Sequence, residues 1–220
     1  RGFEVTTLRR DVETFGRRAQ VAFTEDVAED AARRDFTMNA LYADPDGAVV
    51  DPLGGLPDLR AGRVRFIGDP HARIGEDYLR VLRFFRFSAR FSTAGVDAEG
   101  LAACAAHLEG LAALSRERVG HEMRRLLAAS DPVKAVTAMA GVGVLSAVAE
   151  GADPALLPAL IAAERAASAS PAWPRRAGAL GLWAPDWRLS RAEARRLEAT
   201  RAALEGGEPP AAAAHRHGVE

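Results

Sequence analysis

The side chains best suited to chemistry gather in two stretches of the sequence, RRDFTMNAL at 33–41 and RIGEDYLRVLRFFRF at 73–87. In the second stretch Asp77 and Arg80 stand three positions apart, so on a helix both would project from one face. Because a planar guanidinium offers paired donors, a stripe of arginines is suited to binding phosphate groups. Such a stripe follows Arg80 at helical spacing, with no acidic residue four positions from any member: Arg83, Arg86 and Arg90.

Each stretch also has an interpretation that needs no ligand. The arginine stripe is equally the pattern of a solvated amphipathic helix that carries an i,i+3 ion pair. Its other face, with Leu82, Phe85 and Ala89, would pack against further helices. Asn39 is a polar side chain among apolar neighbours, and burial there would require hydrogen-bond partners in the core. From these residues alone, both interpretations stay open.

The elements that must hold these stretches follow an α+β pattern that changes near Pro70. Before it we expect short strands at 3–8, 20–23 and 62–70, a charged loop at 9–18, a helix at 26–34 and a hairpin within 41–53. After it the apolar spacing is helical, and we expect helices at 76–91, 97–113, 115–129, 131–141, 155–169 and 191–204. Glu76 and Asp77 would then open the first of these helices.

Composition and charge exclude several classes of protein. With 29 basic and 30 acidic residues the net charge is −1, so bulk charge does not hold nucleic acid, although a local arginine patch remains open. Cys104 is the only cysteine, which excludes an internal disulfide and a cysteine-based zinc site. No apolar run approaches the roughly 20 residues of a membrane span, so we expect no membrane partner and a cytoplasmic location.

Further motifs accompany the two stretches in a fixed order. They are VTTLRRD (5–11), GRRAQVAFT (16–24), EDAARRDFTMNALY (29–42), DPLGGLPDL (51–59), RVRFIGDPHARIGEDYLRVLRFFRFSARF (63–91) and LSRERVGHEMRRLL (114–127). Together they resemble the class II tRNA nucleotidyltransferase family, the CCA-adding enzymes, with the bacterial poly(A) polymerases as close relatives. The resemblance is dense from about residue 3 to 127 and loose over the remaining helices.

The resemblance implies an architecture. A partial polymerase-β-like nucleotidyltransferase head, a mixed sheet with helices, would occupy residues 1–69. An all-α neck at 70–130 and a partial helical body at 131–205 would follow. The last segment, 206–220, would be a loose tail.

The resemblance also implies a nucleotide site. Asp77 and Arg80 would read the base, with Glu76 orienting Arg80. The segment around Asp11, Gly16 and Arg17 would match the flexible loop that such enzymes use when they switch from C to A addition. The sugar and triphosphate would be bound by a second group of side chains: Arg33, Arg34, Asp35, Asn39, Arg83 and Arg86.

Elementary hydrogen-bond chemistry agrees with the base-reading role. Cytosine and adenine each present an amino donor beside a ring-nitrogen acceptor, which suits a carboxylate next to a guanidinium. Uracil and guanine present the reverse arrangement, which would leave a carbonyl facing Asp77. Each unpaired buried polar group costs about 1–3 kcal/mol, so two such mismatches would discriminate strongly.

Nucleotidyl transfer also needs carboxylates that hold two divalent metal ions. In the family these come from a GGxVRD…DxD segment before the strand at which this sequence begins, and the 220 residues contain no such segment. We therefore expect an N-terminally truncated chain, inactive alone, with Mg²⁺ bound mainly by the missing segment and no metal site of its own. Glu4 is a candidate third carboxylate, and an ordinary exposed strand glutamate fits the position equally well.

The expected function of the intact enzyme is addition of C, C and A to tRNA 3′ ends from CTP and ATP. A poly(A) polymerase, or an enzyme restricted to CC or A addition, is the alternative within the family. An alternative of another class is a non-catalytic fragment that binds nucleotide or RNA through its arginine stripe.

Overall fold

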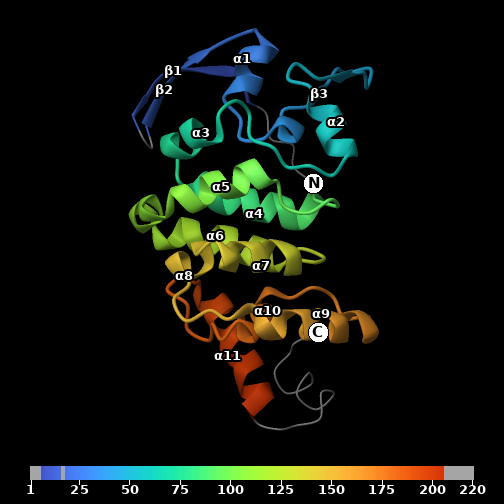
Figure 1. The fold of residues 1–220 in the computed structure, drawn as a ribbon, viewed down its shortest axis with the longest axis vertical. Helices are drawn as coiled ribbons and strands as arrows, with labels where there is room; N and C mark the ends of the chain where they lie inside the picture. The colour runs from blue at the N-terminus through green and yellow to red at the C-terminus, as the bar shows by residue number, and fades with distance from the viewer. Residues whose placement is uncertain (1–5, 16–17, 206–220) are drawn as a thin grey trace.

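The computed structural model describes residues 6–15 and 18–205, and its elements are stacked in layers along one long axis (Figure 1). Strands and short helices form one end of the stack, and successive pairs of helices form the rest. The predicted α+β class is therefore confirmed. None of the helices in the described part of the chain has the length and apolar character that crossing a membrane requires.

The strands form two separate antiparallel pairs. β1 (Arg9–Phe15) pairs with β2 (Arg18–Phe23), and β3 (Tyr42–Ala43) pairs with β4 (Val49–Val50) around the predicted hairpin turn. Within the described residues these pairs do not join into one mixed sheet.

Two strand predictions are wrong. Residues 6–8 lie outside any strand, and β1 occupies the segment predicted as a charged loop. There the charged residues alternate with Val12 and Thr14, a period-two strand pattern that the high charge conceals. Residues 62–70 form only a single bridge, between Phe36 and Phe66, because their partner lies in a short link between helices.

Helices make up most of the rest of the described residues, and three 3₁₀ segments lie among them. The α-helices are α1 (Val27–Ala32), α2 (Gly55–Arg60), α3 (Pro70–Glu76), α4 (Leu79–Phe91), α5 (Ala98–Ala106), α6 (Arg116–Leu127), α7 (Val133–Gly141), α8 (Val144–Val148), α9 (Leu157–Ala166), α10 (Trp173–Ala179) and α11 (Arg191–Glu205). The 3₁₀ turns are η1 (Thr37–Asn39), η2 (Leu108–Ala113) and η3 (Pro154–Leu156).

The helix predicted at 76–91 is divided in two, which decides where Asp77 lies. Asp77 adopts an extended conformation (φ −154°, ψ 106°) between α3 and α4, and its Oδ1 accepts a hydrogen bond from the Leu79 N–H at 3.1 Å. An aspartate that bonds the backbone two residues on competes with helix continuation. Asp77 therefore caps α4 from the junction, and Glu76 ends α3 instead of opening a helix. The helix predicted at 97–113 is similarly divided, at His107.

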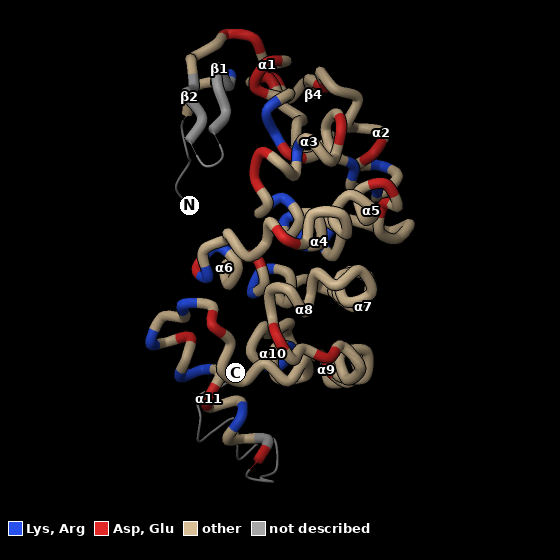
Figure 2. Tube along the Cα trace, turned by 60° about the vertical axis from the view of Figure 1, so that its left-hand side comes forward, with Lys and Arg blue, Asp and Glu red and all other residues tan. Residues whose placement is uncertain are grey.

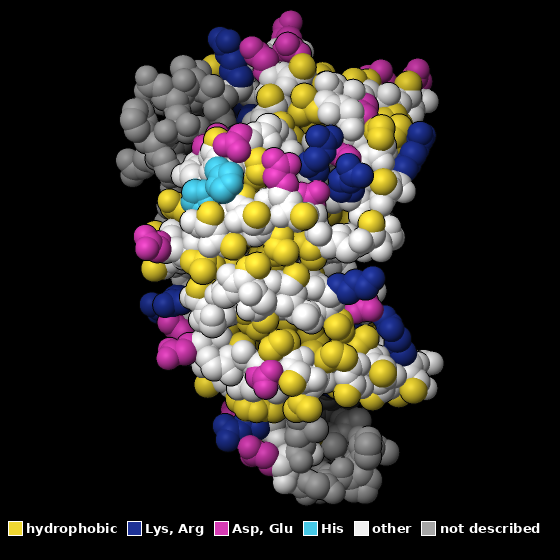
Figure 3. All heavy atoms as spheres, viewed as in Figure 1, with side chains coloured by type: hydrophobic (Ala, Val, Ile, Leu, Met, Phe, Trp, Pro, Cys, Tyr) yellow, Lys and Arg dark blue, Asp and Glu magenta, His cyan; other side chains and the backbone are white. Residues whose placement is uncertain are grey.

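An aromatic cluster joins the RRDFTMNAL stretch to α4. The ring of Phe36 lies 5.0 Å from those of Phe66 and Phe87, and Phe66 lies 5.4 Å from Phe84. Burying each such ring contributes about 1.5–3 kcal/mol to the stability of the fold. The cluster therefore holds Asp35, the residue before Phe36, against α4. On the face drawn in Figure 3, apolar side chains also gather in the seams between helical layers.

The DPLGGLPDL motif positions η1. Asp51 accepts hydrogen bonds from the Gly55 and Leu56 N–H groups (2.7 and 2.9 Å) and so caps α2. A Cβ on Gly55 would lie 2.0 Å from the Thr37 carbonyl oxygen, so only glycine allows α2 to approach this closely. Buried Asp58 accepts from the Thr37 hydroxyl at 2.6 Å. The motif thereby holds the turn that carries Asn39.

Candidate functional site

Asp35 is the meeting point of the two chemical stretches. Its carboxylate is buried and accepts from Arg80 Nε at 3.1 Å and from Arg83 Nε. Its backbone carbonyl accepts from the Ile67 N–H at 3.1 Å, beside the Phe36–Phe66 bridge. Figure 2 marks the acidic and basic positions that come together from α1, α3 and α4.

Arg80 is held firmly while one of its nitrogens stays open. Nε bonds Asp35, and Nη1 donates to the Arg73 carbonyl oxygen (2.5 Å) and to Glu76. Nη2 makes no hydrogen bond to any residue that the structure describes. The guanidinium is therefore fixed in orientation and keeps donors for a ligand. The predicted contact between Glu76 and Arg80 is present.

Asp77 lies within one turn of Arg80, whose N–H donates to the Asp77 carbonyl oxygen at 3.0 Å. The Asp77 carboxylate accepts from Leu79 N–H through Oδ1 and from Arg118 Nη2 of α6 through Oδ2 (2.6 Å). A carboxylate has about four lone-pair sites, so two remain for a ligand. Its side chain is 32% exposed, which leaves those sites within reach.

Arg73 joins the two stretches from α3. Nη1 donates to Glu76 at 2.5 Å, and Nη2 donates to the carbonyl oxygens of Arg33 and Arg34 at 2.8 and 2.6 Å. We call Asp35, Arg73, Glu76, Arg80 and Arg83 the Asp35 cluster.

Buried Asp30 organises the start of the RRDFTMNAL stretch. It accepts from Arg33 Nε (2.9 Å), Arg34 Nη2 (3.0 Å) and the Tyr42 hydroxyl (2.7 Å). Burial raises the pKa of Asp30, but these hydrogen bonds and one from the Arg9 N–H outweigh it and hold the pKa well below its ordinary value of 3.8. Arg34 also lies over the Tyr42 ring, with Cζ 5.0 Å from its centroid.

The whole site carries surplus positive charge. Six guanidinium groups face four carboxylates through the ion pairs of Asp30, Asp35, Glu76 and Asp77. Surplus guanidinium donors beside a fixed carboxylate suit a ligand that combines phosphates with a planar polar group. A nucleotide is such a ligand.

Two family models match the chain. The poly(A) polymerase head domain matches residues 1–65, and the probable RNA and SrmB-binding site of polymerase A matches residues 96–156. The human mitochondrial CCA tRNA nucleotidyltransferase 1 is 46% identical over 127 residues, 57% of this chain and 29% of that protein. The CCA-adding enzyme of Levilactobacillus brevis is 38% identical over 154 residues, 69% of this chain and 38% of that protein.

Solved structures of CCA-adding enzymes resemble this chain as well. The Bacillus stearothermophilus CCA-adding enzyme in complex with CTP has a TM-score of 0.66 and 25% identity, covering 96% of this chain and 62% of that one. The chain belongs to the family of CCA-adding enzymes and poly(A) polymerases. The Thermotoga maritima CCA-adding enzyme complexed with tRNA-CCA shares the fold at a TM-score of 0.58 and 21% identity, over 81% of this chain and 50% of that one.

The chain spans 29 to 38% of the length of these two relatives. The chain itself contains both stretches that form the Asp35 cluster, together with α6. What the family resemblance implied for single residues can therefore be compared with their places in the structure.

Arg86 lies apart from the other predicted phosphate ligands. It is buried and donates through Nε to Glu122 of α6 at 2.5 Å. Burial lowers the pKa of the Arg86 guanidinium below its ordinary value, against the opposing effect of Glu122. The expectation of arginines without acidic partners overlooked this carboxylate, which comes from another helix. A buried and paired guanidinium is placed to join α4 to α6, and this argues against the predicted contact with triphosphate.

The other predicted residues differ in what the structure says of them. Asn39 is half-buried in η1, and its side-chain amide makes no hydrogen bond to the described residues. Asp11 falls in β1, whereas Glu4, Gly16 and Arg17 lie outside the described residues.

Three residues of the site were missed by sequence reasoning. Arg73 and Arg118 fix the two base-reading candidates, and Asp30 fixes the arginines of the first stretch. Arg73 had a local signal, since it stands three positions before Glu76. Arg118 and Asp30 had none that separates them from ordinary surface charges.

Metal ligands do not converge here. Among the described residues, no group of three or more histidine, cysteine, aspartate or glutamate side chains could hold a metal ion. His71 Nδ1 and His107 Nε2 are close, at 3.3 Å, but they are a pair only. Asp35 already bonds two arginines, so the described residues do not fit a magnesium site.

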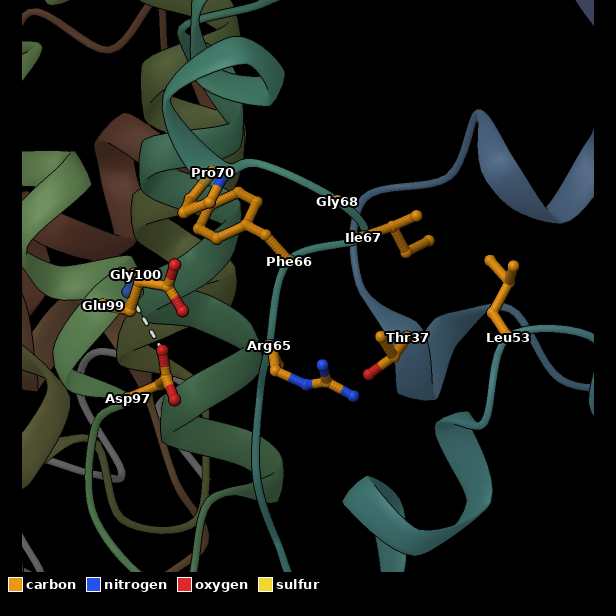
Figure 4. Close-up of a pocket in the computed structure, with 10 residues that line it drawn as sticks. All are labelled: Thr37, Leu53, Arg65, Phe66, Ile67, Gly68, Pro70, Asp97, Glu99 and Gly100. Carbon is orange, nitrogen blue, oxygen red and sulfur yellow. Dashed lines mark hydrogen bonds between the residues drawn. The ribbon is translucent and has the colours of Figure 1, made fainter.

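A separate pocket of about 230 Å³ is lined by the 65–68 segment together with Thr37 and Leu53, and it is drawn in Figure 4. Arg65 is paired with Asp58 at 2.9 Å, and Asp97 accepts from the Gly100 N–H at 3.0 Å. Glu99, which also lines the pocket, adds negative charge. An anionic nucleotide is thus better served at the Asp35 cluster.

Proposed function

We propose that the Asp35 cluster and Asp77 form a nucleotide site that accepts CTP and ATP and rejects UTP and GTP. One observation carries this proposal: Arg80 is fixed by hydrogen bonds from Nε and Nη1 to three acceptors while Nη2 stays open, one turn from a carboxylate with two free lone-pair sites. Side chains, not a nucleic-acid template, would then read the base.

The reading follows from the edges of the bases. Asp77 accepts from the exocyclic amino group of cytosine or adenine, and Arg80 Nη2 donates to the neighbouring ring nitrogen. Uracil turns a carbonyl toward Asp77 and a ring N–H toward Arg80. Each of these mismatched contacts costs about 1–3 kcal/mol, so the two together give roughly 30-fold discrimination or more.

The sugar and triphosphate are bound by the open donors around Asp77 and Arg80. Arg83 uses only Nε on Asp35, and Arg33 uses only Nε on Asp30, so the forked ends of both remain available. Arg34 and Asn39 lie beside them, joined by a hydrogen bond to the Asn39 carbonyl oxygen. Asp35 acts by orienting Arg80 and Arg83 rather than by touching the phosphates.

For the protein as a whole we propose addition of C, C and A to tRNA 3′ ends from CTP and ATP. Support comes from the names of the human and Levilactobacillus brevis relatives and from solved CCA-adding enzymes in complex with CTP, ATP and tRNA. The division into head, neck and body at residues 69 and 130 belongs to the same proposal. A cytoplasmic location stays a prediction, since the human relative is named a mitochondrial protein.

Such transfer would use Mg²⁺ to activate the 3′-hydroxyl and stabilise pyrophosphate. Among the described residues, no three metal-ligating side chains converge. Their part is to bind and orient the nucleotide.

Calorimetric titration of the 220-residue chain with the four nucleoside triphosphates tests the proposal. CTP and ATP should bind at least tenfold more tightly than UTP and GTP, and Arg80→Ala should abolish the preference. Arg60→Ala, at an exposed position in α2, is the matched control and should leave it intact. ATP binding without CTP binding would favour a poly(A) polymerase. Equal binding of all four would contradict base reading.

A further inference from the structure

A pocket of about 550 Å³ lies at the C-terminal ends of α4 and α6, away from the base-reading pair. A second pocket of about 400 Å³ adjoins it, shares Arg90 and Ser130 with it and extends to Lys134, the only lysine of the chain. The first pocket is lined by Arg86, Arg90, Arg125, Ala128, Ala129 and Ser130.

The charge of this surface is not neutralised by its neighbours. Arg90 and Arg125 are exposed and form no salt bridge with any described residue. The one side-chain hydrogen bond of Arg125 within the described part of the chain is to His121 Nε2 (3.4 Å), and Arg90 lies over the Phe91 ring at 5.5 Å. Asp131, the acid of the adjoining pocket, is already bonded to Arg165 at 2.6 Å.

Helix capping does not account for Arg125. Cations near a helix C-terminus are favourable because the last carbonyls are unpaired. At the end of α6, however, buried Arg176 donates to the carbonyl oxygens of Leu127 (2.7 Å) and Ala129. Arg125 therefore points a free guanidinium at solvent where the backbone is already satisfied.

The 550 Å³ pocket and the candidate site lie along the same helix, α4. Arg83 of the Asp35 cluster and Arg86 both lie over the Phe87 ring, at 5.8 and 4.5 Å from its centroid. At about 1.5 Å per residue, Arg90 lies roughly 10 Å beyond Arg83 along the helix. A polyanion whose end occupies the candidate site would thus reach Arg90 and Arg125.

We propose that this pocket binds the phosphodiester backbone of the RNA strand whose 3′ end enters the candidate site, an inference that rests on the proposed function. Arg90 and Arg125 bind the phosphate oxygens, and Lys134 extends the positive surface. Arg86, held by Glu122, adds positive potential without leaving its partner. The match to the RNA-binding family model covers Arg125 and Lys134, whereas α4 lies between the two matched regions.

The test is the salt dependence of RNA binding. Binding is measured by the fluorescence anisotropy of a labelled hairpin RNA that has a single-stranded 3′ end. Each phosphate contact contributes about 0.7–0.9 to the slope of log K against log salt concentration. The double variant Arg90→Gln/Arg125→Gln should therefore lower that slope by roughly 1–2 and weaken binding about tenfold at low salt. Arg90→Lys/Arg125→Lys should restore most of the slope.

The control removes equal charge elsewhere, through Arg60→Gln/Arg195→Gln at exposed positions of α2 and α11. An unchanged slope in the double variant, or an equal fall in the control, would overturn the proposal. So would displacement of RNA by polyglutamate at matched charge, which would point to an acidic protein partner. CTP-over-UTP preference is measured in the same variants and should not change. Its absence in the parent chain would instead count against the proposed function.

Discussion

Two arginine–carboxylate clusters lie in different layers of the molecule, one between α3 and α4 and the other between α9 and α10, and they differ in what their donors do. In the Glu164 cluster, formed by Glu164, Arg175 and Arg176, the Arg176 side chain is 2% exposed. Its Nε and Nη2 bond Glu164 at 3.0 and 2.8 Å, and Nη1 bonds the last carbonyls of α6. In the Asp35 cluster Arg80 keeps Nη2 open.

The pairing of a guanidinium, more than its presence, separates a structural arginine from a functional one. In the Glu164 cluster all three nitrogens of Arg176 are bonded, and this closed arginine stabilises the fold around it. A cluster that is fixed on one side and open on the other is prepared for a ligand. Each cluster contains a pair of arginines that are close in the sequence, Arg175 with Arg176 and Arg80 with Arg83, and the Asp35 cluster adds Arg73. The two pairs look alike in the sequence.

The largest expected effect is on stability and comes from the closed cluster. Arg176→Met should lower the free energy of unfolding by about 3–5 kcal/mol, because it leaves Glu164 without its main partner and frees buried carbonyls. Unfolding in guanidinium chloride measures this loss of free energy. Arg175→Met, at a side chain 27% exposed, should cost far less. Equal losses in both variants would contradict the structural role assigned to the completely bonded Arg176.

The next effect is on binding and comes from the open cluster. Arg80→Met should weaken CTP binding by about 10- to 100-fold, as expected for losing a charged hydrogen bond of 1.5–3 kcal/mol. Its stability loss should be smaller than that of Arg176→Met, because Asp35 keeps Arg83 and Glu76 keeps Arg73. Calorimetry and unfolding on one sample give both numbers. A stability loss as large as that of Arg176→Met, with CTP binding unchanged, would refute the comparison.

A smaller effect concerns selectivity rather than affinity. Arg118→Gln removes the partner that holds Asp77 Oδ2 at 2.6 Å, so the carboxylate should lose its fixed orientation. We expect the ratio of CTP to UTP affinity to fall by about 3- to 10-fold, equivalent to roughly 0.7–1.4 kcal/mol. Arg116→Gln, two positions earlier and paired with exposed Asp186, is the matched control and should leave the ratio unchanged.

The smallest effect is a pH dependence at the start of the RRDFTMNAL stretch. The pKa of Asp30 is lowered on folding, so its contribution to stability is complete well above the ordinary value of 3.8 and is lost as the pH falls through and below it. Asp30→Asn should therefore be less stable than the parent chain at pH 7, and the gap should narrow below about pH 4. A gap that stays constant from pH 7 to pH 3 would rule out this role for the carboxylate.

The sequence anticipated the pieces of the site better than their assembly. RRDFTMNAL and EDYLR were predicted to serve one nucleotide site, and the structure brings them together at Asp35. Glu76 was predicted to orient Arg80 and contacts it. These relations involve short spacings or a motif pair specific to the family, so local pattern was enough.

Contacts between distant segments could not be predicted in the same way. Arg118 meets Asp77 across 41 positions, and Arg86 meets Glu122 across 36. No periodicity links such residues, because only the packing of α6 against α4 brings them together. The break at Asp77 was missed for a related reason: the helical pattern runs through it, and a single side-chain bond to Leu79 N–H decides otherwise.

The measurement that tests the account most directly is the ratio of CTP to UTP affinity in Asp77→Asn. An asparagine amide can donate to the uracil carbonyl that the Asp77 carboxylate repels, while its single oxygen keeps one of the two hydrogen bonds that Oδ1 and Oδ2 of Asp77 accept from Leu79 N–H and Arg118 Nη2. The account predicts that the ratio falls by at least about tenfold, a change of some 1.4 kcal/mol, through tighter UTP binding as well as weaker CTP binding. A folded variant that keeps the parent ratio would show that Asp77 does not read the base.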